Sequence, residues 1–175
     1  VARLQAGRLR IGYLSADFHI HATSQLMAQM LECHDRSAFE VTLLSTGKDD
    51  HSAMRQRMVA SSERFEDLHG QGFDAIARRV RELEIDILVD LKGATHDTLL
   101  PVLAQRPAPL QVAWLGFPGT TGAPYIDYLI GDGIVTPLAD AARFGEKIAQ
   151  MPHCYQPNDA HRARPRPSRR ADWGI

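Results

Sequence analysis

Several common signals are missing from this sequence, and their absence narrows its class. Its 175 residues include two cysteines, Cys33 and Cys154, with no metal-ligand spacing. We therefore expect reduced thiols in a cytoplasmic protein. No apolar run approaches the ~18 residues that a membrane-spanning helix needs, and no signal peptide precedes the first expected strand. We expect no membrane partner.

Motifs for nucleotide cofactors and metals are also missing. The turn after the first expected strand does not read Gly-x-Gly-x-x-Gly, which argues against NAD or FAD, and there is no Walker loop or Gly-x-Ser-x-Gly elbow. His19 and His21 stand two residues apart in a loop, which is a weak metal signal. The net charge of −1 gives no reason to propose a nucleic-acid surface. We expect no metal, no cofactor and no nucleic-acid partner.

What the sequence does contain is the pattern of an α/β domain. Hydrophobic content of 44% and charged content of 23% predict a packed core, and the length fits one domain with or without a tail. Short apolar segments alternate with amphipathic ones, which is typical of βαβ units and a parallel sheet. We expect strands at 10–15, 39–45, 64–68, 86–91, 111–115 and 126–130, and helices from 23, at 52–60, from a cap at Asp74, and at 98–104.

Three loops follow strands and should share the edge of the sheet where open α/β sheets bind ligands: 17–22, 92–97 and 116–124. The last of them holds three glycines at spacing three, two prolines and two threonines. Such a loop can present backbone N–H groups and hydroxyls to a ligand, and glycine lets the backbone approach closely. An ordinary Gly/Pro connection between sheet elements is the alternative.

The first loop carries residues suited to acid–base chemistry. Asp17, His19 and His21 precede a helix for which Thr23 or Ser24 is the expected N-cap. Asp17 can orient an imidazole, cap the helix or make a turn. His21 is the better candidate of the two histidines, because it lies just before the helix N-terminus.

Charged residues also flank the apolar segment 86–91. We expect Asp86 and Asp90 at solvated strand ends, with Asp90 near the loop edge. Lys92 follows at the same edge, where we expect it to be solvated; contact with a phosphate or a peptide is the alternative.

The end of the sequence is basic and punctuated by proline. Five arginines stand among prolines and a serine between 162 and 170, so this segment cannot continue a helix or strand. We expect a solvated linker over 162–175, with a phosphate-attracting arm as the alternative, after a domain that spans 1–161. Both ends look like those of a piece cut from a longer protein.

Two blocks of this sequence resemble the catalytic region of O-linked N-acetylglucosamine transferases, family 41 of the glycosyltransferases. The matching segments are Arg8–Phe18 with His21, Thr23 and Ser24; Arg106–Gly122; Asp127, Tyr128 and Asp132; Glu146 and Lys147; and Met151–His153. The resemblance implies the N-terminal, Rossmann-like lobe of a GT-B enzyme. It also implies a C-terminal UDP-binding lobe beyond this chain and tetratricopeptide repeats upstream.

The resemblance also implies roles for individual residues. His21 matches a histidine at the donor–acceptor junction, Asp17 an acidic residue proposed to handle the acceptor proton, and Thr23 a threonine of the same pocket. The residues that match a loop packed against the donor sugar are Leu115, Gly116, Pro118, Thr120 and Thr121. The chain departs from many members at Ala22 and Gln25, where they have proline and a second histidine.

The implied reaction is inverting transfer of N-acetylglucosamine from UDP-N-acetylglucosamine to Ser or Thr hydroxyls of proteins, without a metal. Positioning and charge stabilisation would supply most of the acceleration. The alternatives are a non-catalytic peptide-binding module and a GT-B enzyme that acts on a small sugar acceptor.

Overall fold

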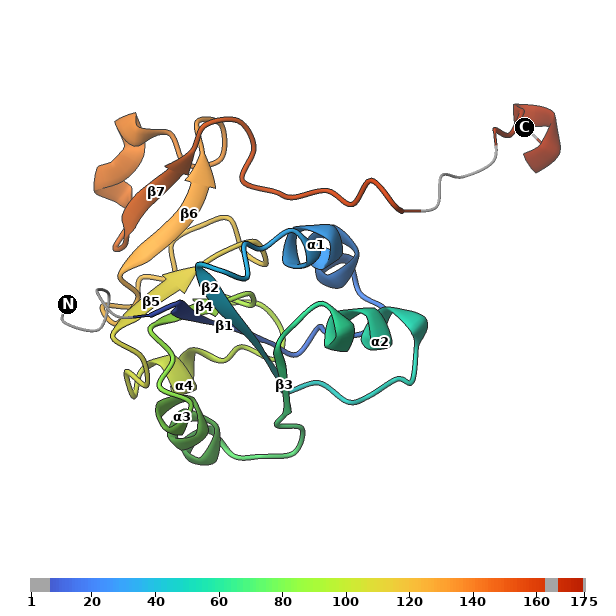
Figure 1. Cartoon of the computed structure of the whole chain (residues 1–175). Helices are drawn as coiled ribbons and strands as arrows, with labels where there is room; N and C mark the ends of the chain where they lie inside the picture. Colours follow the sequence, from blue (N-terminus) through green and yellow to red (C-terminus); the bar gives the residue numbers. More distant parts are fainter. Residues whose placement is uncertain (1–6, 163–166, 175) are drawn as a thin grey trace.

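The computed structural model describes residues 7–162 and 167–174. Within these residues, seven strands form one parallel sheet in the order β3-β2-β1-β4-β5-β6-β7 (Figure 1). The strands are β1 (Leu9–Ser15), β2 (Phe39–Ser45), β3 (Arg64–Asp67), β4 (Ile87–Asp90), β5 (Leu110–Ala113), β6 (Tyr128–Asp132) and β7 (Lys147–Met151). The predicted α/β class, a parallel sheet flanked by helices, is confirmed.

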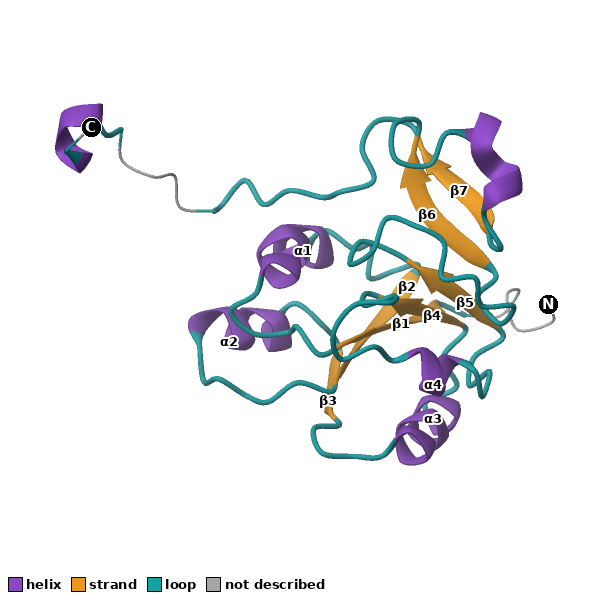
Figure 2. Cartoon of the chain, turned by 180° about the vertical axis from the view of Figure 1, so that it is seen from behind, coloured by secondary structure: helices purple, strands orange, loops and turns teal. Residues whose placement is uncertain are grey.

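Helices cover both faces of this sheet (Figure 2). The α-helices are α1 (Ala22–Glu32), α2 (Ala53–Ala60), α3 (Phe73–Glu82) and α4 (Leu100–Leu103); η2 (Leu138–Arg143) and η3 (Arg170–Trp173) are 3-10 helices. Helix α1 buries Met27 and Leu31 in one apolar cluster, and α3 buries Ile76 and Val80 in the other. The apolar stripes of the helices thus close a core on each side of the sheet.

Most predicted elements occur within a few residues of their expected bounds, but the predicted N-caps of α1 and α3 are wrong. Gly72, not Asp74, is the N-cap of α3, and Asp74 lies in its first turn. Strand β7 was missed, because it is a short edge strand with two partly buried central residues and exposed ends, and its apolar pattern is weak. Strand β5 ends at Ala113, two residues before the predicted end.

The segment after β7 returns across the helices (Figure 1). Asp159 is buried and forms an ion pair of 2.5 Å with Arg57 of α2, and the amide of Ala160 donates to Gln29 of α1. Arg164 and Arg166 of the predicted linker lie outside the described residues. No helix in the described part of the chain is long and apolar enough to cross a membrane.

The strand order creates a switch point at the middle of the sheet. Strand β1 pairs with β2 on one side and β4 on the other, so Ile11 lies opposite both Val41 and Ile87. The chain leaves β1 toward one flank of the sheet and leaves β4 toward the other flank. In open α/β sheets, ligands bind beyond the carboxyl ends of the strands at such a point. The loops after β1 and β4 are therefore the first place to search for a site.

Candidate functional site

A buried ion pair joins the loops that follow β1 and β4. Nζ of Lys92 lies 3.0 Å from Oδ1 and 2.8 Å from Oδ2 of Asp17, and both side chains are at least nine-tenths buried. Because the two residues are 75 positions apart, the parallel sheet is what brings them together. Lys92 is not solvated as predicted, since its ammonium is bound to this carboxylate instead of water.

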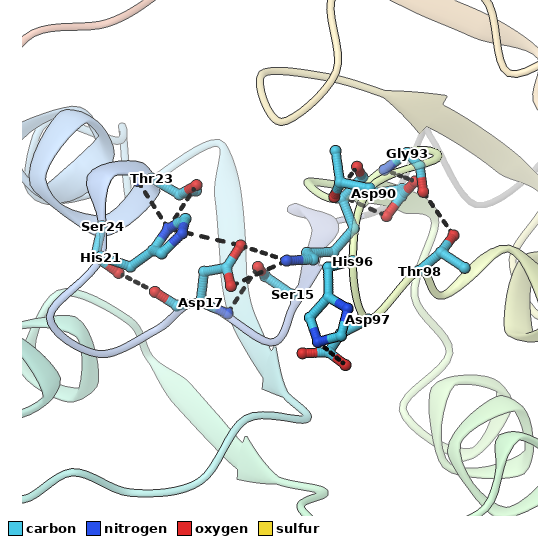
Figure 3. A network of polar contacts seen from close by, with 12 residues as sticks. Ser15, Asp17, His21, Thr23, Ser24, Asp90, Gly93, His96, Asp97 and Thr98 are labelled. Atoms are coloured by element: carbon cyan, nitrogen blue, oxygen red, sulfur yellow. Dashed lines mark hydrogen bonds and ion pairs between the residues drawn. The ribbon is translucent and has the colours of Figure 1, made fainter.

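Backbone hydrogen bonds hold both loops in place (Figure 3). The hydroxyl of Ser24 donates to the carbonyl of Asp17, and buried Arg55 donates to the carbonyl of Phe18. On the other loop, Asp90 accepts from the amide of Lys92 at 3.0 Å and from that of Gly93 at 2.8 Å. Each loop is thus fixed by groups that its own strand or a neighbouring helix supplies.

Asp90 is fully buried, not at a solvated strand end as predicted. Burial raises the pKa of its carboxyl, and the hydrogen bonds from Lys92 and Gly93 act in the opposite direction. Asp86 is partly buried at the other end of β4 and accepts from the amide of Arg10. These two aspartates therefore shape the backbone at the ends of the strand.

His21 is the N-cap of α1. Its Nδ1 accepts from the amide of Thr23 at 3.2 Å, and the hydroxyl of Thr23 lies at the same distance. Oδ2 of Asp17 is 3.7 Å from this nitrogen, as Figure 3 shows. The cap was predicted at Thr23 or Ser24, two or three residues too late. A neutral ring that accepts at Nδ1 carries its proton on Nε2, and the side chain of His21 is 42% exposed.

The threonines of the glycine-rich loop after β5 form hydrogen bonds within the protein. The hydroxyls of Thr120 and Thr121 both donate to Glu146, and so does the amide of Thr121, at 2.8 Å. Burial alone would raise the pKa of Glu146, but the hydrogen bonds from Thr121 and Thr120 outweigh it and hold the pKa below its ordinary value. These hydroxyls are therefore committed to a buried carboxylate, whose role the sequence analysis missed.

Leu115 and Gly116 form a tight turn at the start of this loop. Leu115 has φ of 69°, and the amide of Gly116 bonds to the carbonyl of Trp114 at 2.9 Å. A Cβ on Gly116 would lie 2.0 Å from the carbonyl oxygen of Leu91. Close approach to the neighbouring chain thus already requires glycine here, and the expected approach to a ligand stays a prediction. Pro118 is exposed.

A pocket of about 400 Å³ opens on the other side of Asp17, over the ends of β1 and β2. Its lining includes His19, Lys48, His69 and Asp97. His19, the weaker candidate of the two histidines, therefore lines this pocket. Among the residues that the structure describes, no group of three histidine, cysteine or acidic side chains is placed to hold a metal ion.

The parallel sheet, flanked by helices and with a switch point at its middle, defines a Rossmann-like lobe. Within that class, the model of glycosyl transferase family 41 matches residues 2–170, and the chain belongs to this family.

Similar proteins and a similar solved structure support this assignment to the family. The chain is 43% identical to the probable UDP-N-acetylglucosamine–peptide N-acetylglucosaminyltransferase SEC of Arabidopsis thaliana, over 87% of this chain. It is 41% identical to the UDP-N-acetylglucosamine–peptide N-acetylglucosaminyltransferase of Caenorhabditis elegans, over 85% of this chain. A mutant of the O-GlcNAc transferase of Thermobaculum terrenum superposes with a TM-score of 0.82 at 35% identity, over 86% of this chain. The chain spans 16%, 13% and 29% of these three proteins.

Proposed function

We propose that this chain is the N-terminal lobe of the catalytic region of an inverting protein O-GlcNAc transferase. In the proposed reaction, N-acetylglucosamine passes from UDP-N-acetylglucosamine to Ser or Thr hydroxyls of proteins. The observation that carries the proposal is the meeting of Asp17, His21 and Thr23 at the switch point of the sheet. The sequence resemblance implies that the reacting groups lie at these positions. Residues 1–161 form the lobe, and 162–175 lead toward a C-terminal UDP-binding lobe.

The chemistry needs few groups from this lobe. The acceptor oxygen attacks C1 of the sugar and the bond from C1 to UDP breaks. The hydroxyl proton passes to water or to an oxygen of the departing diphosphate as the new bond forms. His21 contacts the reacting groups with Nε2 of its partly exposed ring, which the amide of Thr23 orients at Nδ1. Asp17 lies behind the ring, 3.7 Å from Nδ1, and places a negative charge beside it. The turn at Leu115 and Gly116, exposed Pro118, and the backbone of Thr120 and Thr121 form the wall against the donor sugar.

The charge that develops on UDP must be met outside this lobe, by basic groups and backbone dipoles of the C-terminal lobe. We propose that no metal or cofactor takes part, that a protein or peptide is the acceptor, and that the enzyme works in the cytoplasm after an array of tetratricopeptide repeats. A chelator should therefore leave the rate of the full-length protein unchanged, and a rate that falls and returns with added Mg²⁺ would contradict this part.

The test uses the full-length protein that contains this chain. Incubation with labelled UDP-N-acetylglucosamine and a pool of Ser/Thr peptides should place label on peptide hydroxyls, and His21→Ala should abolish most of it. Release of UDP without labelled peptide would instead indicate a small acceptor or water. Peptide binding without turnover would indicate a non-catalytic module. Either of these outcomes would overturn the proposal.

A further inference from the structure

Asp17 is shared between two partners of different character. Lys92 reaches both of its carboxylate oxygens at hydrogen-bond distance, 3.0 and 2.8 Å. His21 lies at 3.7 Å from Oδ2, beyond hydrogen-bond distance. The carboxylate therefore forms its hydrogen bonds with the ammonium of Lys92 and has none with the ring of His21.

The ring nitrogen that faces Asp17 is already used. Nδ1 of His21 accepts from the amide of Thr23 at 3.2 Å, and Thr23 is buried. A proton on Nδ1 would face this N–H and leave a buried donor without its acceptor. The hydroxyl oxygen of Thr23, also at 3.2 Å, can accept such a proton, but a free Asp17 carboxylate would stabilise it with a full negative charge. Two states of the ring thus compete, and the availability of the Asp17 carboxylate decides between them.

We propose that Lys92 is a positioning residue that fixes the tautomer of His21 through Asp17. By holding both carboxylate oxygens, Lys92 prevents Asp17 from drawing a proton onto Nδ1. The ring therefore keeps Nδ1 as the helix cap and carries its proton on Nε2, in a side chain that is 42% exposed. In this state His21 is a hydrogen-bond donor, suited to an oxygen of the sugar nucleotide or acceptor, and not the base that takes the acceptor proton.

Asp17 is unsuited to that task as well. Both of its oxygens face the ammonium of Lys92, and a proton delivered there would set a carboxylic acid against a cation in a buried site. Asp17 and His19 lie beside the ring of His21, with the ring centroid of His19 5.9 Å away, and Lys92 lies behind Asp17. The consequence for catalysis rests on the proposed function, whereas the tautomer itself can be measured on this chain alone.

The experiment is ¹⁵N NMR of the histidine rings at neutral pH, because protonated and bare ring nitrogens have widely separated shifts. The signals of His21 are assigned by their loss in His21→Asn. In the wild type, Nδ1 should be bare and Nε2 protonated. In Lys92→Met, the ratio of the two tautomers should move by about tenfold toward a protonated Nδ1, because Asp17 has lost its charged partner. Lys92→Arg should retain the wild-type pattern.

Two controls separate this effect from a general disturbance. Lys147→Met removes an exposed lysine of β7 and should leave the rings unchanged. The double variant Asp17→Asn with Lys92→Met should return to the wild-type pattern, because the competing carboxylate is gone. If Lys92→Met does not fold, Lys92→Gln keeps one donor for Asp17 and should give a mixture of tautomers.

The outcomes distinguish this inference from the proposed function. A protonated Nδ1 in the wild type, or an unchanged ring in folded Lys92→Met, would overturn the role of Lys92 whatever the full-length protein transfers. If the ring behaves as expected but no sugar transfer is found, the role of Lys92 in fixing the tautomer of His21 stands and the proposed function fails.

Discussion

Two loops share one edge of the sheet and handle polar groups in opposite ways. The loop after β1 leaves the ring of His21 half exposed, with an ion pair behind it. The loop after β5 turns the hydroxyls of Thr120 and Thr121 inward, onto buried Glu146. The first loop therefore keeps a side chain available for a ligand, whereas the second uses its side chains to fix its own backbone.

The comparison separates two ways in which a substitution can lower activity. In the proposed function, His21 faces the ligand, so a change there should cost turnover more than stability. A change at Glu146 removes the hydrogen bonds that hold the loop after β5. Activity should therefore fall only as far as the folded state is destabilised. The predictions below test this division.

The largest effect is expected at His21. In the full-length protein, His21→Ala should lower kcat by about 10²-fold or more, as is typical when a group that contacts the reacting atoms is removed. It should also destabilise the lobe by about 1 kcal/mol, because the N-cap of α1 is lost. Rates of peptide glycosylation, and unfolding of this chain in denaturant, measure the two effects.

His21→Asn is the matched control, because asparagine is a good N-cap but has no imidazole. It should restore the stability and leave kcat low. If His21→Asn recovered the rate together with the stability, the division between the two loops would be wrong at its first residue.

The second effect is expected at Glu146. Glu146→Ala leaves the amide of Thr121 and two hydroxyls without their acceptor, which should destabilise the chain by about 2–3 kcal/mol. Unfolding in urea, monitored by tryptophan fluorescence, measures this. At temperatures where the variant is fully folded, the full-length enzyme should keep a kcat within a few-fold of wild type. A hundredfold loss of kcat without destabilisation would mean that Glu146 acts on the ligand directly.

Sequence reasoning reached the fold because apolar periodicity records it directly. The segment at β4 is apolar on both faces, and α3 repeats its apolar residues on one face, so both could be identified from spacing alone. Strand β7 could not, because an edge strand buries few residues. Asp17 and His21 were singled out by their place before a helix, and the family resemblance implied the roles proposed for them.

Their partners were beyond the reach of spacing. Lys92 is 75 positions from Asp17, and Glu146 is 25 from Thr121. A lysine after a strand is usually solvated, and nothing local indicates that a carboxylate from another strand will bury it. The same limit applies to Gly116. Only glycine fits there, because the carbonyl of Leu91, in the loop after the neighbouring strand, leaves no room for a Cβ.

A third effect is expected at the glycines of the second loop. A Cβ at Gly116 would stand 2.0 Å from backbone of the neighbouring loop, so Gly116→Ala must displace one of the two chains. We expect a loss of about 2 kcal/mol in the free energy of unfolding. Gly122→Ala is the matched control: it has φ of 64° and open space around it, and should lose about 1 kcal/mol. Equal losses at both sites would show that the contact with Leu91 is not tight.

The smallest effect is the change in unfolding free energy at acidic pH. The pKa of Glu146 is lowered in the fold, so its ionised form contributes stability that is present above the unfolded value of about 4.5 and is lost as pH falls through the folded value. Glu146→Gln removes this contribution. The gap in unfolding free energy between wild type and Glu146→Gln should therefore be full at pH 7 and narrow below about pH 4.5.

Buried Asp90, whose pKa is raised, acts in the opposite sense, because its stabilising contribution is lost as pH rises. It is common to wild type and Glu146→Gln and cancels in the difference between them. Denaturant unfolding of both proteins at pH 3.5, 5 and 7 measures the gap. A constant gap would show that Thr120 and Thr121 hold Glu146 equally well in its protonated form. The second loop would then owe its shape to packing and not to the carboxylate's charge.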